Sequence, residues 1–160
     1  MKLPYHEGTW FAVPLEGGGF GIGVVARATS KGKVILCYFF GPRSNGVPAL
    51  EEVERLRPRD AIQVVQIGDL ALIRGKWPII GEGASWKRSE WPMPPFVRRC
   101  ELSRRAWRVQ YSDVDPNKID YEEPEPSDSA LERDALLGYR AVEQLLTRLL
   151  STPPATGQRD

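Results

Sequence analysis

The side chains that most often perform catalysis or hold metals are scarce in this chain of 160 residues. His6 is the single histidine, which excludes a histidine pair on a metal and a histidine base with separate histidine ligands. Cys37 and Cys100 are far apart, unlike the closely spaced thiolates of zinc sites, and each lies in an apolar run. Such runs predict buried, reduced thiols of a cytoplasmic protein. We therefore expect no enzymatic activity, no cofactor and no metal site.

Two segments imitate ligand-binding loops without completing them. Residues 17–23 are rich in glycine, but they lack the G-x-G-x-x-G spacing and lead into a predicted strand instead of a helix. The segment beginning at Asp113 has oxygen-bearing side chains at positions one, three and five of a calcium loop. Lys118 and Pro124, however, stand where that loop needs glycine and a bidentate glutamate. We interpret the first segment as a bend in a sheet and the second as an acidic connector.

Charge is divided unevenly along the chain, although the net charge is only +1. Residues 1–112 contain 17 lysines and arginines against 10 acids, whereas residues 113–160 contain 5 against 11. The acidic part can capture a basic protein partner, unless folding pairs it with the basic part. The alternative is a nucleic-acid or small-ligand binding module without catalytic activity, which would use the glycine-rich bend and the arginines of residues 98–108, with Trp107 among them. Strand alternation divides these arginines between two faces, and the pI of about 7.8 is low for that function, so nucleic acid is the weaker hypothesis.

Residues 77–96 combine tryptophans with prolines that exclude a regular helix. Tryptophans among polar neighbours in such a loop either pack inside or stand exposed as anchors of a protein interface. The sequence leaves both alternatives open. Together with the acids of the connector, the candidate partner-binding residues are Asp113, Asp115, Asp120, Glu122, Glu123, Trp86 and Trp91.

Short apolar runs separated by turns predict a mainly antiparallel β structure for the first two thirds of the chain. Residues 62–67 and 70–73 resemble a hairpin about Gly68-Asp69, and residues 96–102 and 106–111 resemble another. The predicted fold class is α+β, with a strongly bent sheet or a small open barrel and a C-terminal amphipathic helix. The remaining predicted strands cover residues 9–15, 20–27 and 34–40.

The predicted organisation is a β-rich domain at 1–112, an acidic connector at 113–128, a helix at 129–151 packed on the same domain, and a disordered tail at 152–160. Ser129 and Glu132 have the spacing of a capping box, and apolar residues then recur at helical spacing. The broad apolar face predicts either a monomer or a homodimer formed through this helix. We expect a cytoplasmic protein, since no membrane-spanning run and no apolar signal core are present.

Five short motifs follow one another along the chain. They are Glu7-Gly8-Thr9-Trp10-Phe11-Ala12-Val13-Pro14-Leu15, Gly19-Phe20-Gly21-Ile22-Gly23-Val24-Val25, Tyr38-Phe39-Phe40-Gly41, Trp77-Pro78-Ile79-Ile80-Gly81 and Trp91-Pro92-Met93-Pro94 with Phe96. In this order they are similar to the immunity protein 26 family of bacterial polymorphic-toxin systems, over roughly residues 5–112. The resemblance implies a cytoplasmic, non-enzymatic protein that binds a cognate toxin and blocks it. It implies no catalytic residues and assigns no interface.

Overall fold

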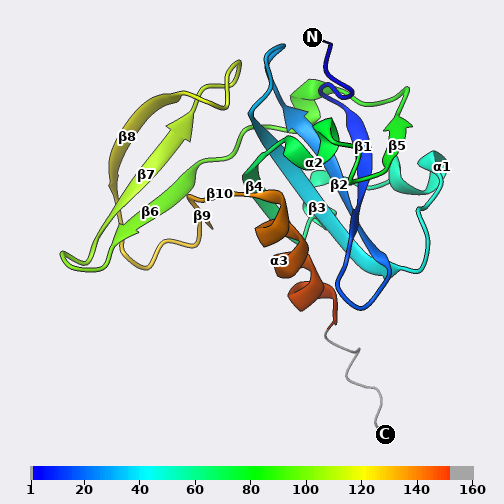
Figure 1. Ribbon diagram of the computed structural model, residues 1–160. Coiled ribbons are helices and arrows are strands. Elements are labelled where there is room, and N and C mark those ends of the chain that lie inside the picture. Colours follow the sequence, from blue (N-terminus) through cyan, green and yellow to red (C-terminus); the bar gives the residue numbers. More distant parts are fainter. Residues whose placement is uncertain (1, 152–160) are drawn as a thin grey trace, which may run out of the picture.

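Two β-sheets and a C-terminal helix make up the protein in the computed structural model, which describes residues 2–151 (Figure 1). The sheets are mainly antiparallel, and neither closes into a barrel. The predicted α+β class is therefore confirmed. The tail predicted to be disordered, residues 152–160, lies outside the described residues.

The larger sheet has six strands in the order β10-β4-β3-β2-β1-β5. Neighbours pair antiparallel, except that β10 runs parallel to β4. Aromatic and β-branched residues dominate its central strands, as expected where strands are covered by other parts of the protein. The strands are β1 (Thr9–Pro14), β2 (Phe20–Arg27), β3 (Val34–Ser44), β4 (Gln63–Gly68), β5 (Ile79–Glu82) and β10 (Leu136–Leu137).

Both faces of this sheet are buried. Alternate residues of β3 enter two separate apolar clusters, with Cys37 and Phe39 in one and Tyr38 and Phe40 in the other. Gly23 of β2 lies between aromatic rings, and a Cβ atom at this position would come within 2.4 Å of Phe11. The bare backbone that the glycine-rich segment predicts is thus used for close packing inside the sheet.

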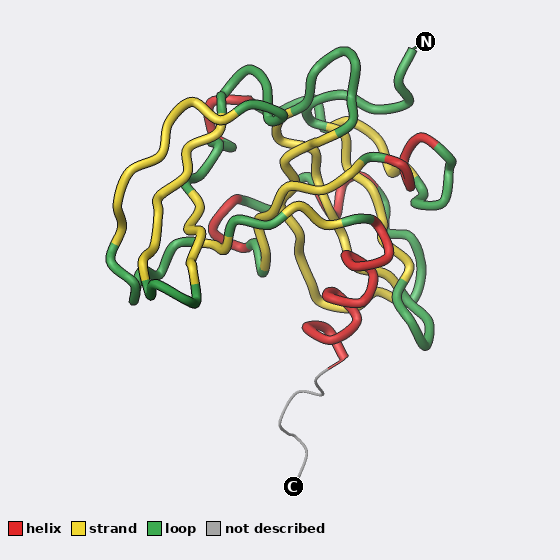
Figure 2. The backbone as a smooth tube through the Cα atoms, turned by 60° about the vertical axis from the view of Figure 1, so that its left-hand side comes forward, coloured by secondary structure: helices red, strands yellow, loops and turns green. Residues whose placement is uncertain are grey.

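The smaller sheet has four strands in the order β8-β7-β6-β9 and lies to one side of the larger sheet in both views (Figures 1 and 2). The acidic segment predicted as an irregular connector contains one of these strands, so that prediction is wrong over residues 119–125. Antiparallel pairing with β7, the preceding strand, overrides the weak local strand preference of these residues. The strands are β6 (Phe96–Cys100), β7 (Arg105–Tyr111), β8 (Ile119–Glu125) and β9 (Glu132–Arg133).

Short helical turns fill the connections. The predicted second strand of a hairpin at residues 70–73 is instead helix α2 (Leu70–Ile73). The carboxylate of Asp69, just before it, accepts hydrogen bonds from the Tyr5 hydroxyl at 2.7 Å and the Lys33 amide at 3.0 Å. These bonds tie the start of α2 to Tyr5 and to the chain before β3. The other short helices are α1 (Leu50–Val53), η1 (Pro58–Asp60) and η2 (Arg88–Glu90).

The C-terminal helix α3 is shorter than predicted, since it spans Tyr139–Ser151 instead of residues 129–151. The missing part forms β9, which pairs with β6, and β10, which pairs with β4, so the segment joins the two sheets. Ser129 does not cap a helix, because its hydroxyl donates to Glu125 Oε2 at 2.6 Å. Helix α3 buries Val142 and Leu146 against the larger sheet.

Candidate partner-binding surface

The seven candidate residues do not form one surface. Asp113 and Asp115 lie in the connection between β7 and β8, whereas Asp120, Glu122 and Glu123 lie on β8. Trp86 and Trp91 belong to the connection between β5 and β6, which crosses the larger sheet and contributes to its core. The candidate residues therefore belong to three structurally different parts of the molecule.

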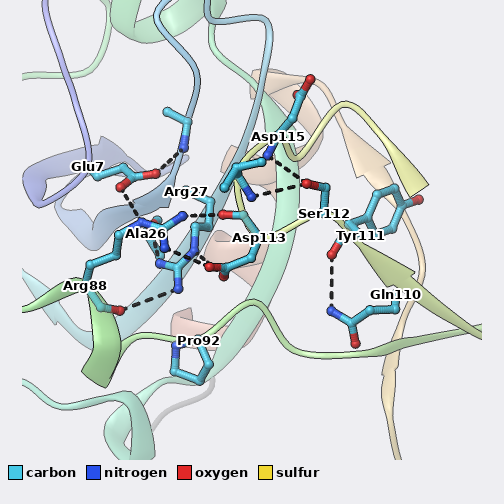
Figure 3. A network of polar contacts seen from close by, with 12 residues as sticks. Glu7, Ala26, Arg27, Arg88, Pro92, Gln110, Tyr111, Ser112, Asp113 and Asp115 are labelled. Carbon is cyan, nitrogen blue, oxygen red and sulfur yellow. Dashed lines mark hydrogen bonds and ion pairs between the residues drawn. The ribbon is translucent and has the colours of Figure 1, made fainter. Parts of the chain in front are cut away.

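Asp113 is bound inside the chain by two arginines (Figure 3). Its Oδ1 accepts from Nε of Arg27 at 2.8 Å, and its Oδ2 accepts from Nη1 of Arg88 at 2.7 Å. Arg88 also donates to the main-chain carbonyl of Asp113 and, through Nε, to Glu7 Oε1 at 2.8 Å. The other Glu7 oxygen accepts the Ala28 amide at 3.1 Å. The network ties the β7–β8 connection to β2 of the larger sheet and to the chain preceding β1.

Electrostatics support this assignment of Asp113. Hydrogen bonds from Arg88, and then from Arg27, hold the pKa of the Asp113 carboxyl below its usual range. Arg27 is 3% exposed, so water contributes little to stabilising its guanidinium. The Asp113 carboxylate and the carbonyl of Ala26, 2.7 Å from Nη1, take that role. The charge of Asp113 is therefore balanced by two arginines within the chain, a pairing that the sequence did not indicate.

Asp115 shapes a turn. Its Oδ1 accepts both the main-chain and the side-chain amide of Asn117, each at 2.9 Å, and this contact lowers the pKa of Asp115. Asn117 in turn accepts the amide of Val34 at 3.4 Å, at the start of β3. The calcium-like spacing thus builds a local turn against the larger sheet. Within residues 2–151, no cluster of three or more metal-ligating side chains occurs.

Trp91 is 1% exposed, so the expectation that it is an exposed anchor is wrong. Its ring makes edge-on contacts with the rings of Trp10, Tyr38 and Phe40, at centroid distances of 5.8, 5.1 and 6.1 Å. The proline-rich segment lies extended over the sheet, and the Tyr38 hydroxyl anchors it by donating to the Pro92 carbonyl at 2.6 Å. Burial of this ring is the packing alternative that the sequence left open.

Trp86 is half-buried. Its ring stacks on Trp91 with centroids 6.5 Å apart and lies against Gly8, where a Cβ atom would come within 3.2 Å of it. Trp86 therefore covers the aromatic cluster and has part of its surface open to solvent. It is the one tryptophan of the candidate pair that a partner can reach.

Strand β8 carries the three remaining acids, Asp120, Glu122 and Glu123, all on the surface. It forms an edge of the smaller sheet. Two apolar side chains on the same strand, Ile119 and Tyr121, are 45% and 50% exposed. An exposed aromatic side chain on a rigid strand is typical of a protein interface, and acidic charges beside it can speed association with a basic partner. We call the residues of β8, Ile119–Glu125, the acidic edge.

The arginines of the neighbouring hairpin partly neutralise the acidic edge. Arg98 pairs with Glu122, and Arg108 lies 3.9 Å from Glu125. Arg99 donates to main-chain carbonyls of residues 127 and 129 at 3.0 and 2.6 Å. These internal bonds weaken the nucleic-acid hypothesis, which needs free arginines along a groove. Asp120 and Glu123 take part in no ion pair with any described residue.

Sequence reasoning missed both apolar members of the acidic edge and the two arginines that bind Asp113. Ile119 and Tyr121 alternate with acids, and this period of two could have indicated a strand inside the acidic segment. Nothing in the sequence marks Arg27 or Arg88 as partners of Asp113, because they are 86 and 25 residues away from it.

The two thiols differ, contrary to the prediction that both are buried. Cys37 is buried in the larger sheet, and burial raises its pKa, whereas Cys100 is exposed at the end of β6. Hydrogen bonding to Ser103 lowers the pKa of Cys100. In the described part of the chain, no helix has the length and apolar character needed to cross a membrane.

These features define a small α+β protein with an exposed acidic sheet edge. The sequence model of the immunity protein 26 family matches residues 6–108, and the chain belongs to this family. The resemblance seen in the five motifs is thereby confirmed. The match ends within β7, so the acidic edge lies beyond it. No curated protein and no solved structure matches the chain.

Proposed function

We propose that this protein binds a cognate protein toxin of a bacterial polymorphic-toxin system and inhibits it stoichiometrically in the cytoplasm. Family membership is the observation that carries the proposal. Inhibition by binding requires no catalytic residue, no metal and no cofactor. It requires an accessible surface whose shape and charge fit the toxin.

We assign first contact with the toxin to the acidic edge. Asp120 and Glu123 are exposed and have no ion-pair partner among the described residues, so their charges act outward. Charges at the rim of an interface mainly speed association. Tyr121 supplies apolar contact area beside them. If the toxin is a nuclease, carboxylates in a row can take the place of substrate phosphates in its basic groove, and the bound protein would cover the active site or a neighbouring exosite.

Trp86 remains a second candidate contact, on the larger sheet. Asp113, Asp115 and Trp91 are removed from the contact set, because the first two hold the chain together and the third lies in the core. We propose a monomer as the active form, since α3 already packs Val142 and Leu146 inside its own chain.

The test begins with capture of the tagged full chain from a lysate of its native host. The partner's toxin domain is then purified, and its activity is titrated with the protein. A loss of activity that is complete at a one-to-one ratio supports the proposal. A captured partner that remains fully active at excess protein, or the absence of any protein partner, overturns it.

A further inference from the structure

The acidic edge is the longest strand edge that the fold leaves open. The two sheets have four edge strands, namely β5, β8, β9 and β10. Three of them have only four, two and two residues, whereas β8 has seven. Short edges are a common protection against unwanted pairing. Among the edge strands of residues 2–151, only β8 therefore lacks this protection.

The main chain of β8 offers hydrogen-bonding groups at its centre. In an antiparallel strand, the N–H and C=O of one residue point to the same side, and successive residues alternate between sides. Pro124 has no N–H, so it fits where its nitrogen faces away from β7. By alternation, the N–H and C=O of Glu122 also face away from β7. A bulge opposite Gln110/Tyr111 interrupts the ladder near Asp120, so the open groups lie between the bulge and the proline.

The charge of β8 determines which kind of strand can pair with its open edge. A second copy of the chain would place acids opposite acids, which is destabilising between paired strands. A basic strand would instead place its charge beside Asp120 and Glu123, neither of which is ion-paired within the described chain. The bulge, the proline and the like charges of β8 thus prevent two copies of the chain from pairing through this strand. The open main-chain groups between the bulge and the proline remain available to a partner of opposite charge.

We propose that the toxin binds by adding an extended basic segment as a fifth strand to β8, in register with Glu122. This rests on the proposed function and specifies its partner. Because paired residues share a face, the segment has an apolar residue beside Tyr121 and, two positions along, a lysine or arginine beside Glu123. Main-chain bonds supply affinity in this binding mode, and the side chains supply specificity.

The first test does not depend on the toxin. A blocked heptapeptide with threonine at alternate positions, and lysine and valine between them, is added to the full chain, and amide exchange is followed by NMR. With the peptide filling about nine-tenths of the sites, the Glu122 amide exchanges about tenfold more slowly. A peptide of the same sequence with N-methylated threonine amides gives no protection, since it cannot pair as a strand.

The strand-addition proposal is overturned if the lysine peptide leaves the Glu122 amide unprotected, or if a peptide with glutamate in place of lysine protects it equally. The second test uses the captured toxin domain with Glu122→Pro, which removes the outward N–H, and Glu122→Gln, which keeps it. We expect the proline variant to bind the toxin at least about tenfold more weakly than the glutamine variant. Each variant's unchanged NMR spectrum outside β8 shows that it folds.

Equal affinity of the two variants overturns strand addition while full inhibition of the toxin still supports the proposed function. Absence of a toxin partner overturns the proposed function while the peptide experiment still decides whether β8 accepts a basic strand.

Discussion

The two sheets of this protein differ in how much of their surface is buried. The six-stranded sheet is apolar on both faces and is covered by α3 on one and by residues 86–96 on the other. The four-stranded sheet has a small buried part around Phe96 and Val109 and ends in an exposed acidic strand. Stability is therefore concentrated in the larger sheet and accessible surface in the smaller one, with the Asp113 network between them.

The two cysteines provide the largest expected contrast. We expect Cys100 to react with an aromatic disulfide reagent on the order of a thousandfold faster than Cys37, which becomes accessible only when the larger sheet opens. The lowered pKa of Cys100 and the raised pKa of Cys37 both increase this difference in reaction rate, because the thiolate is the reactive form. The Cys100→Ser variant should retain only the slow reaction. Two thiols that react at one rate would contradict the division between the sheets.

Truncation of a buried ring should affect stability far more than truncation of an exposed one. We expect Trp91→Ala to lower the free energy of unfolding by about 3–5 kcal/mol, because it leaves a cavity beside four aromatic rings. Tyr121→Ala on the acidic edge is the matched control and should change it by less than about 0.5 kcal/mol. Urea denaturation measures both. Similar losses would show that β8 is part of the core.

Breaking the Asp113 network between the sheets should have an intermediate effect on the free energy of unfolding. We expect Asp113→Asn to destabilise the protein by about 1–2 kcal/mol, less than a fully buried pair, since Asp113 is 57% exposed. Asp120→Asn, an exposed aspartate without an ion pair among described residues, is the control.

The same variant has a defined pH dependence. Because the folded pKa of Asp113 is lowered, its contribution is complete above the unfolded pKa of about 4 and is lost as the pH falls through the folded value. The difference in unfolding free energy between wild type and Asp113→Asn should therefore shrink below about pH 4. A difference that persists undiminished at acid pH would mean that the charge of Asp113 is not what stabilises the network.

Neutralising the acidic edge should hardly affect folding but should slow binding. We expect Asp120→Asn with Glu123→Gln to change the unfolding free energy by less than about 0.5 kcal/mol and to reduce the association rate with the toxin domain by about 3–10-fold at low salt. The salt dependence of association should flatten as well. Glu16→Gln with Glu51→Gln removes the same charge from the β1–β2 turn and from α1, away from the acidic edge, and should leave the rate unchanged. Equal effects of both pairs would show that only net charge matters.

Much of the larger sheet was predictable because its signals are local. Apolar runs bounded by glycine turns mark β1, β2 and β3, and proline marks the irregular segment around Trp91. The prediction was wrong where pairing overrode local preference, at β8 and at β9 and β10, which replace a loop and the start of a helix. The Ser129 and Glu132 spacing had the form of a capping box, but a bond to Glu125 took its place.

Some features of the candidate surface could likewise be predicted from the sequence, and others could not. By itself the sequence determined the family, the α+β class, the scarcity of catalytic side chains and the concentration of acids after residue 112, since these follow from residue identity and order. The tertiary structure alone decided which acids are free. Asp113 meets arginines distant in sequence and is neutralised, whereas strand pairing leaves Asp120 and Glu123 on an open edge, because contacts between distant residues are not encoded in local spacing.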